Sequence, residues 1–251
     1  MDPGRYDLPV PLPRFYAPDA RAGSPVTLPP DEAHHLAHVL RLGPGDDLTV
    51  FDGIGSEWRA RVASVSRRAV TIDIGDPVKA VPEPKVAVTL AIGVLKGDQM
   101  DTVIRDAVAL GVSVIAPLAS AHVAVPARAW QGPVASERWR RVALAAARQT
   151  GRAVVPLVLP VAPISDVISR IGDARVYICV EPARSTAHDK ADKRRPASAV
   201  LFVGPEGGWS DAEIDVVTRF GARRMTLGPR TLRAELAPIV ALSALWTEWG
   251  W

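Results

Sequence analysis

The sequence is poor in cysteine and contains no long apolar run. Cys179 is the one cysteine in 251 residues, which excludes a disulfide framework and a zinc site built on thiolates. The N-terminal stretch MDPGRYDLPVPLPR lacks the apolar core of a signal peptide, and no run approaches the roughly 18 apolar residues of a membrane span. These absences predict a soluble, cytoplasmic protein without a membrane partner.

Charge of one sign is not in large excess either. Lys and Arg number 30 against 27 for Asp and Glu, which gives a net charge of +3. A balance this close does not by itself indicate a nucleic-acid-binding protein, so any basic binding surface must be local. The length, with 48% hydrophobic residues, allows one large domain or two modest ones.

Several motifs of common enzymes are missing. There is no G-x-x-x-x-G-K-[ST] loop for nucleoside triphosphates and no G-x-S-x-G nucleophile elbow. The GPEGG stretch is not G-x-G-x-x-G and comes late in the chain, which disfavours a Rossmann dinucleotide site. His34 and His38 have the i, i+4 spacing of a metal pair, but no third ligand is evident, and we predict no metal.

The composition and the hydrophobic pattern change along the chain. The first residues are proline-rich, as in a flexible arm. PDEAHHLAHVLRL, residues 30–42, then has a helical pattern, three strand-like segments follow, and Asp52-Gly53 between two of them is typical of a hairpin. The predicted parts are a flexible N-terminal arm (1–13), a small β-rich domain (14–78), a proline-containing linker (79–85) and a C-terminal domain (86–251).

The C-terminal domain alternates strands and helices. KVAVTLAIGVL is a near-continuous apolar run of the kind found in strands buried on both faces, and DQMDTVIRDAVALG has apolar residues at helical spacing. A strand, a helix and a strand at this spacing form a parallel crossover unit. Further strands are predicted near 112–118, 154–159, 175–180, 199–203 and 223–227, with helices at 136–149 and 235–249. This pattern predicts an α/β fold with a parallel sheet.

Two of these strands end in Gly-Pro. LFVGPEGGWSDAEID places Gly204-Pro205 after one strand, and Ser210 with Glu213 three residues later is a capping box that begins a helix. RRMTLGPRTLRAELAP places a second Gly-Pro after the strand near 223–227. Ligands of open α/β sheets bind beyond the carboxyl ends of strands, where glycine allows close backbone approach. Each loop alone is equally consistent with a plain turn, but the pair favours one pocket that holds its ligand by backbone groups.

Arginines are concentrated in ERWRRVALAAARQTGR. They lie on or just after one predicted helix, and they are Arg138, Arg140, Arg141, Arg148 and Arg152. Such a run is commonly a solvated helix face, although it also suits a stripe that binds RNA phosphates. The residues alone leave both interpretations open.

VGPEGGWSDAEID and LGPRTLRAELAPIVAL closely resemble the two signature loops of the RsmE family. Its members are bacterial 16S ribosomal RNA (uracil-1498-N3)-methyltransferases of the SPOUT superfamily. The resemblance extends to LKGDQMDTVIRDAVALGV and AARQTGRAVVP, and in the N-terminal part to RFYAP, HHLAHVLRLGPGDDL and FDGIGSEWRARV. It therefore covers nearly the whole chain from Arg14 onward.

The resemblance implies a PUA-like N-terminal RNA-binding β-barrel and a SPOUT-type α/β domain with a C-terminal trefoil knot, which is a rare exception among folds. It also implies a homodimer that binds S-adenosylmethionine in the knot and acts on the 16S rRNA of the 30S ribosomal subunit. The cofactor-binding residues carried over by position are Glu181, Pro182, Gly204, Pro205, Glu206, Gly207, Leu227, Gly228, Arg230, Leu232 and Arg233.

The implied reaction suggests further roles. Uracil N3 carries a proton, and the anion left by its loss spreads onto the flanking carbonyl oxygens. A guanidinium stabilises such an anion, so we expect Arg233 to be catalytic, with Glu235 as the candidate base. The target base must be unpaired, because N3 is blocked in a base pair. The RNA-binding residues that we expect are Arg14, Arg41, Arg138, Arg141 and Arg152.

Four positions depart from the family pattern, and they are Ala109, His122, Arg148 and Leu236. They leave both Gly-Pro loops intact and indicate a divergent lineage or an altered substrate choice. Two alternatives therefore stay open: a SPOUT methyltransferase on another RNA, such as transfer RNA, and a catalytically inactive RNA- or ribosome-binding homologue. A small-molecule α/β enzyme is disfavoured because it leaves the N-terminal β-rich domain unexplained.

Overall fold

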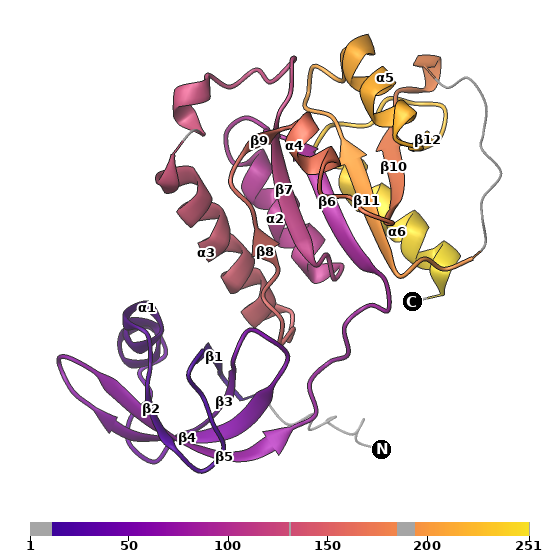
Figure 1. Ribbon diagram of the computed structural model, residues 1–251. Helices are drawn as coiled ribbons and strands as arrows, with labels where there is room; N and C mark the ends of the chain where they lie inside the picture. The colour runs from indigo at the N-terminus through magenta and orange to yellow at the C-terminus, as the bar shows by residue number, and fades with distance from the viewer. Residues whose placement is uncertain (1–11, 131, 185–193, 251) are drawn as a thin grey trace, which may run out of the picture. The chain divides into compact units, whose positions relative to one another are not determined.

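The structure is a computed structural model in which residues 12–130, 132–184 and 194–250 are described (Figure 1). Residues 1–11, most of the predicted arm, lie outside the described residues. The chain divides into two compact units. The first is Met1–Val81 with Gly151–Val154, and the second is Pro82–Thr150 with Val155–Trp251.

The first unit is built on a five-stranded sheet in the order β1-β3-β4-β5-β2. Its strands are β1 Arg14–Tyr16, β2 Pro25–Thr27, β3 Asp47–Phe51, β4 Glu57–Val65 and β5 Val70–Val78. Strands β3, β4 and β5 pair antiparallel in succession, whereas β1 pairs with β3 in parallel. The sequence predicted β3, β4 and β5 but not β1 and β2, because three-residue strands are too short for an alternating pattern to be detected.

The turn between β3 and β4 confirms the predicted hairpin. Asp52 Oδ1 accepts hydrogen bonds from the backbone N–H groups of Ile54 at 2.9 Å and Ser56 at 3.0 Å. Gly53 has a φ of +82°, a conformation that glycine adopts without steric cost. The aspartate side chain thus closes its own turn, which is the physical origin of the Asp-Gly signal.

The predicted helix over 30–42 is shorter than expected and changes type. Helix α1 spans Pro30–His34 and continues as a π-helical turn, η1, over His35–Val39. Its fully buried Leu36 packs into the hydrophobic cluster formed by one face of the sheet. Glu32 is also buried, and its carboxylate accepts a hydrogen bond from the Tyr16 backbone N–H at 3.1 Å. The short helix is therefore held by its contacts with the sheet rather than by its length.

The second unit is built on a parallel sheet in the order β12-β10-β11-β6-β7-β8, with β9 also paired to β7. Its strands are β6 Ala87–Gly93, β7 Val114–Ala119, β8 Leu157–Val158, β9 Ala162–Pro163, β10 Arg175–Cys179, β11 Ser198–Val203 and β12 Arg223–Met225. Every strand pair in it is parallel, which confirms the prediction. The carboxyl ends of β10, β11 and β12 consequently meet at one edge of the sheet.

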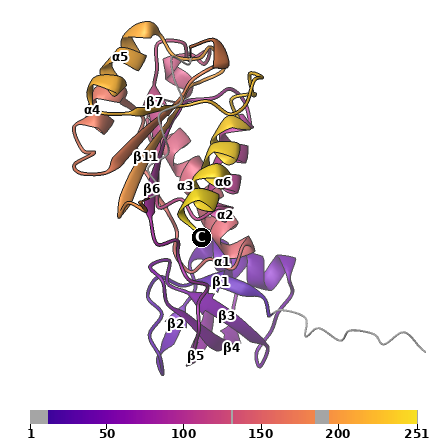
Figure 2. The same ribbon diagram turned by 90° about the vertical axis from the view of Figure 1, so that its right-hand side faces the viewer.

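Helices cover both faces of this sheet (Figure 2). The elements on one face are α2 Gln99–Ala109, α3 Pro133–Gln149 and α6 Ala237–Trp249, and those on the other are α4 Ile164–Ile168 and α5 Asp211–Arg219. The short helices η2 Ala127–Ala129 and η3 Pro182–Arg184 lie in connections. Among the described residues, no helix is long and apolar enough to cross a membrane.

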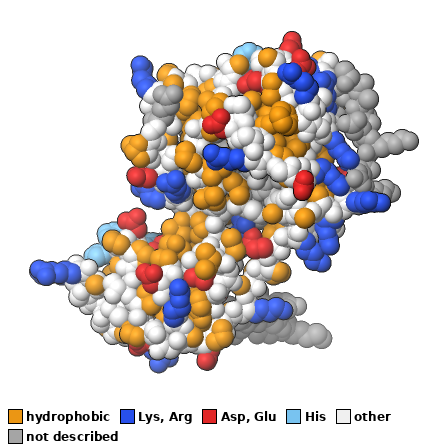
Figure 3. Space-filling view, in the orientation of Figure 1, with side chains coloured by type: hydrophobic (Ala, Val, Ile, Leu, Met, Phe, Trp, Pro, Cys, Tyr) orange, Lys and Arg blue, Asp and Glu red, His pale blue; other side chains and the backbone are white. Residues whose placement is uncertain are grey.

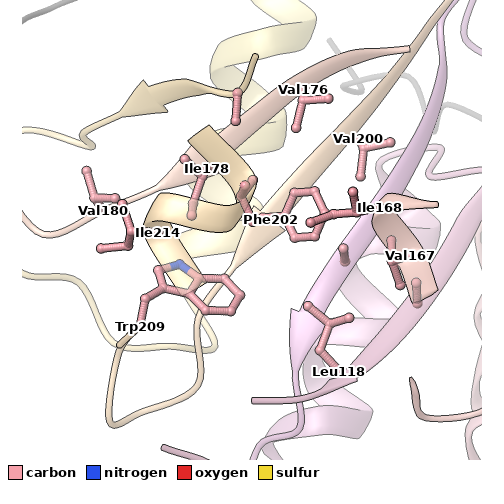
Figure 4. Close-up of a cluster of buried hydrophobic side chains, with 14 residues drawn as sticks. Leu118, Val167, Ile168, Val176, Ile178, Val180, Val200, Phe202, Trp209 and Ile214 are labelled. Carbon is pink, nitrogen blue, oxygen red and sulfur yellow. The ribbon is translucent and has the colours of Figure 1, made fainter. Parts of the chain in front are cut away.

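The core under α4 and α5 shows how the sheet is closed on that face (Figure 4). Phe202 of β11 and Ile178 of β10 are fully buried, and they pack with Ile168 of α4 and Ile214 of α5. Trp209 joins the cluster, and its Nε1–H donates to the carbonyl oxygen of Cys179 at 3.0 Å. This buried hydrogen bond ties the segment after β11 to the end of β10, where the candidate site begins.

The remaining differences from the predicted elements are local. Helix α4 was not predicted, because five residues are too few to show helical periodicity. The predicted strand 154–159 shortens to Leu157–Val158 at the edge of the sheet, and 223–227 shortens to Arg223–Met225. In the latter case the freed residues belong to the loop that follows β12.

Candidate active site

The loop Gly204–Gly208 follows β11 and lies against the end of β6. A Cβ atom at Gly93, the last residue of β6, would stand 2.5 Å from Pro205 Cδ and 2.7 Å from Pro205 N. No Cβ atom tolerates contacts this short, so only glycine at position 93 lets the loop approach the strand. The Glu206 carboxylate then accepts a hydrogen bond from the Lys96 backbone N–H at 3.0 Å, which fastens the loop to the β6–α2 connection.

Gly207 and Gly208 of this loop are enclosed by two other strand ends. A Cβ at Gly207 would lie 2.7 Å from His122 Cβ and 2.8 Å from the His122 carbonyl oxygen, in the segment after β7. Gly208 has a φ of +69°, and a Cβ there would lie 2.5 Å from Glu181 Oε1, after β10. The loop thus packs between the ends of β6, β7 and β10. This close packing explains why the loop contains glycines better than a plain turn does.

The predicted capping box is confirmed at the start of α5. The Glu213 N–H donates to Ser210 Oγ at 3.3 Å, and the Ser210 N–H donates to Glu213 Oε2 at 2.9 Å. Glu213 Oε1 also accepts from the Ala121 backbone N–H at 2.9 Å. Burial raises the pKa of Glu213, but the hydrogen bonds from Ala121 and Ser210 outweigh it and leave the pKa below its ordinary value of 4.5.

This lowered pKa predicts an acid-dependent contribution to stability. Because the folded pKa lies below the unfolded one, the ionised Glu213 stabilises the protein above about pH 4.5, and that contribution is lost as the pH falls through the folded pKa. We expect Glu213→Gln to lower the free energy of unfolding at pH 7 by about 1–2 kcal/mol. The deficit should shrink in acid, as measured by urea unfolding across pH.

Glu137→Gln on α3 is the matched control, since it removes the same charge from an exposed position. It should leave the unfolding free energy within ~0.5 kcal/mol of the wild type. An equal loss for both variants, or a Glu213→Gln deficit that does not vary with pH, would contradict the assignment.

A pocket opens where the carboxyl ends of β10 and β11 meet the loop after β12. The predicted cofactor residues that line it are Glu181, Pro182, Gly204, Pro205, Glu206, Leu227, Arg230 and Leu232. Gly207, Gly228 and Arg233 are not in its lining; Gly207 instead packs on His122, as described above. Cys179 and Thr231, which were not predicted, also line it. Burial raises the pKa of the Cys179 thiol to about 12, so this thiol is uncharged at neutral pH.

The residues present fit a ligand that is held by backbone groups. Gly228 has a φ of +87°, and residues 227–232 make no backbone hydrogen bond with another described residue. Their N–H and C=O groups are therefore free to bind a ligand with both donors and acceptors, such as an adenine ring. The apolar side chains of Leu227 and Leu232 beside them suit a flat apolar surface.

Arg184 supports one wall of this pocket, and no sequence motif had marked it as a candidate. Its Nη1–H donates to the Trp209 carbonyl oxygen at 2.9 Å and lies 3.0 Å from Asp211 Oδ1. Its Nε lies 3.6 Å from Glu181 Oε2. The guanidinium thus links the segment after β10 to the loop after β11.

A second hollow adjoins the pocket and shares Glu206, Leu232 and Ala234 with it. Both predicted catalytic residues, Arg233 and Glu235, line this hollow, together with Lys96 of the β6–α2 connection and Gln99 at the start of α2. The Arg233 side chain is 86% exposed, whereas Glu235 is 21% exposed, and their closest N–O distance is 3.9 Å. At that distance the guanidinium remains available to an anion in the hollow.

The predicted RNA-binding arginines belong to both units and differ in their surroundings. Arg14 forms a bidentate pair with Glu57 at 2.9 and 3.0 Å and lies over the Phe51 ring. Arg138 is paired with Asp101 at 2.6 Å and is half exposed, and Arg152 is buried. Arg41 and Arg141 are exposed, and Arg41 has a φ of +57°. On the face in Figure 3, Lys and Arg side chains are spread over both units with acidic side chains among them.

The positions that depart from the family pattern also fall in different places. His122 adjoins the first loop, and its Nδ1 lies 3.1 Å from the Gly207 carbonyl oxygen. Ala109 and Leu236 are exposed, at the end of α2 and just before α6. Arg148 is partly buried on α3. His122 thus contacts the first loop, and the Leu236 backbone N–H donates to the Arg233 carbonyl oxygen in the second at 3.0 Å.

Comparison with known proteins identifies the family. Residues 82–246 match the RNA methyltransferase domain family, and residues 28–75 match the RNA methyltransferase PUA domain. The ribosomal RNA small subunit methyltransferase E of Synechocystis is 33% identical over 91% of this chain and 75% of its own length. The chain belongs to the RsmE family.

Solved structures agree with the RsmE assignment. The Neisseria gonorrhoeae ribosomal RNA small subunit methyltransferase E, bound to S-adenosylmethionine, is 32% identical with a TM-score of 0.84 over 95% of this chain and 98% of its own. A Legionella pneumophila protein in complex with S-adenosylmethionine gives 29% identity and a TM-score of 0.86 over the same shares. The expected parallel α/β fold with an N-terminal PUA-like domain is confirmed, whereas the trefoil knot stays a prediction.

Proposed function

We propose that this chain transfers a methyl group from S-adenosylmethionine to N3 of a uridine in the 16S rRNA of the small ribosomal subunit. The observation that carries the proposal is the junction of two hollows at one sheet edge. One is lined by both Gly-Pro loops, and the other by Arg233 and Glu235. RsmE relatives named as small subunit rRNA methyltransferases, one of them solved with S-adenosylmethionine, support both the cofactor and the substrate class.

The cofactor belongs in the pocket between the two loops. The backbone groups of residues 227–232 would hold its adenine ring, and the Gly204–Gly208 loop and the Glu181-Pro182 segment would form the facing walls. Gly207 and Gly228 remain in the proposed cofactor set as residues that shape these walls. Arg233, which lines the adjoining hollow, stays a proposed neighbour of the cofactor whose charge acts on the substrate. When bound, S-adenosylmethionine supplies an electrophilic methyl group on a positively charged sulfur.

The chain's own task is to convert uridine N3 into a nucleophile. Loss of the N3 proton leaves a negative charge shared between N3 and its two flanking carbonyl oxygens. Arg233 would stabilise that charge, because its side chain lines the hollow and its guanidinium is 3.9 Å from the Glu235 carboxylate, too far for a close ion pair. Glu235, more enclosed than Arg233, would accept the proton.

The exposure of each predicted RNA-binding arginine suggests its role. Arg41 and Arg141 are exposed and suit direct phosphate contacts, and the half-exposed Arg138 can add to them. Arg14 and Arg152 are enclosed, so we propose that they shape the surfaces that meet the RNA. The domain limits 14–78, 79–85 and 86–251 likewise stand as proposals.

We also propose a homodimer. Two apolar side chains are exposed at the start of α6: Leu236 just before the helix is 46% exposed, and Val240 within it is 36% exposed. Burial of these side chains against a second copy of the chain would stabilise a dimer. Light scattering of the purified protein should give twice the chain mass of 26.8 kDa.

The experiment that tests the function uses assembled small subunits from cells that lack their own N3-methyluridine modification. The subunits are incubated with the protein and labelled S-adenosylmethionine, and the digested rRNA is analysed by mass spectrometry. N3-methyluridine at one position is the expected product. Transfer to another RNA, or cofactor binding without any transfer, would instead establish one of the two alternatives.

A further inference from the structure

The hollow that holds Arg233 is lined by a second basic residue, Lys96. Within residues 12–130, 132–184 and 194–250 the Lys96 ammonium group forms no ion pair. Two carboxylates also line the hollow: Glu206 accepts a hydrogen bond from the Lys96 backbone N–H, and Glu235 lies 3.9 Å from Arg233. An unpaired cation at a concave site is a natural partner for an anion.

The backbone of Lys96 is fixed in place relative to the cofactor loop. The 3.0 Å hydrogen bond to Glu206 ties residue 96 to that loop, and the adjacent Gly97 has a φ of +59°. The exposed Lys96 side chain can therefore change conformation while its backbone stays beside the pocket. A flexible lysine on a fixed backbone can adjust the position of its ammonium group to that of a bound substrate.

Gln99 supplies a second observation at this hollow. Its side-chain Oε1 is buried and has no hydrogen-bond partner among the described residues. A buried acceptor without a donor is costly, so such an atom usually bonds to an ordered water or to a ligand. Lys96 lies in the β6–α2 connection and Gln99 is the first residue of α2, and both line the same hollow as Arg233.

We propose that Lys96 is a substrate-binding cation that, with Arg233, flanks the target uracil and stabilises the anion formed at N3. The inference rests on the proposed function. The charge left when the N3 proton passes to Glu235 is shared with both carbonyl oxygens, so two cations can each meet one oxygen. Lysine and arginine offer donors only. Cytosine carries a donor amino group where uracil has O4, so the pair would also select uracil against cytosine.

The test compares wild type, Lys96→Met and Lys96→Arg on the unmodified small subunits. Lys96→Met should lower kcat near pH 7 by roughly 10- to 100-fold. The deficit should narrow as the pH rises, because alkali removes the N3 proton without help. Lys96→Arg should restore most of the rate. Subunits with cytidine at the target position should bind the wild type more weakly than uridine subunits do, and Lys96→Met should reduce that difference.

Lys79→Met is the control, because it removes an exposed lysine that lines none of the hollows described here. Unfolding midpoints and S-adenosylmethionine affinity should be equal in all four proteins. A Lys96→Met enzyme with the wild-type kcat, pH profile and uridine preference would overturn the inference while leaving the proposed function standing. A wild type that forms no N3-methyluridine would overturn both.

Discussion

Arg233→Ala should lower kcat for rRNA methylation by roughly 10²- to 10³-fold while S-adenosylmethionine still binds. The physical reason is the position of Arg233, which lines the hollow beside the cofactor pocket but not the pocket itself. Its charge would act on the uracil anion, which exists only after the proton has left. The variant should therefore lose transition-state stabilisation rather than binding. Single-turnover rates and calorimetric cofactor titrations measure the two separately.

Arg105→Ala is the control for this prediction, since Arg105 is exposed on α2 and lines neither hollow. It should retain the wild-type rate. Arg233→Lys should recover only part of the activity, because an ammonium group cannot reproduce the planar guanidinium. If Arg233→Ala turns over at the wild-type rate with cofactor bound, Arg233 is not the stabilising group. If it loses cofactor affinity instead, its role lies in the pocket.

Gly93→Ala should reduce affinity for S-adenosylmethionine by about 10- to 100-fold, equivalent to ~1.4–2.7 kcal/mol of binding free energy. A Cβ at this position would stand 2.5 Å from Pro205 Cδ and 2.7 Å from Pro205 N. Because Pro205 is buried and part of the first loop, the loop must move rather than a flexible side chain. We also expect a loss of ~1–3 kcal/mol in unfolding free energy from overpacking.

Gly43→Ala makes the same chemical change where a Cβ would meet nothing within 4 Å and the backbone φ is not positive. It should leave cofactor affinity unchanged. The decisive comparison is between calorimetric affinities of the two variants at a temperature where both are folded. Equal affinities would show that the first loop can shift without harm to the pocket, and the close packing on β6 would then have no functional meaning.

Local signals in the sequence were reliable wherever one short segment contains both the cause and its effect. The Asp52 turn and the Ser210–Glu213 capping box are closed by side chains a few residues away, and both were predicted. Helix α4 and strands β1 and β2 are too short for their periodicity to show, so they were missed. Their stability comes from packing on neighbours that are distant in the chain.

The residues of the candidate site likewise fall into those that local sequence signals predicted and those that they missed. The Gly-Pro loops stood out because glycine and proline mark strand ends, and their positions in the chain fixed the pocket. Lys96 and Arg184 carried no such mark, because an isolated basic residue in a loop is usually a solvated charge. The strand order β12-β10-β11-β6 brings Lys96, which follows β6, to the same hollow as Arg233, which follows β12. The role of Arg184 depends on its contacts with Trp209, Glu181 and Asp211.

The sequence by itself determined the parallel α/β domain, the two Gly-Pro loops and, through its resemblance, membership of the RsmE family. It did so because hydrophobic periodicity and turn chemistry are local properties of the chain. The tertiary structure alone decided why Gly93, Gly207 and Gly208 must be glycine and which cations meet beside the pocket. Those facts depend on the order of the strands, which brings together residues that are far apart in the chain. No local sequence pattern contains that information.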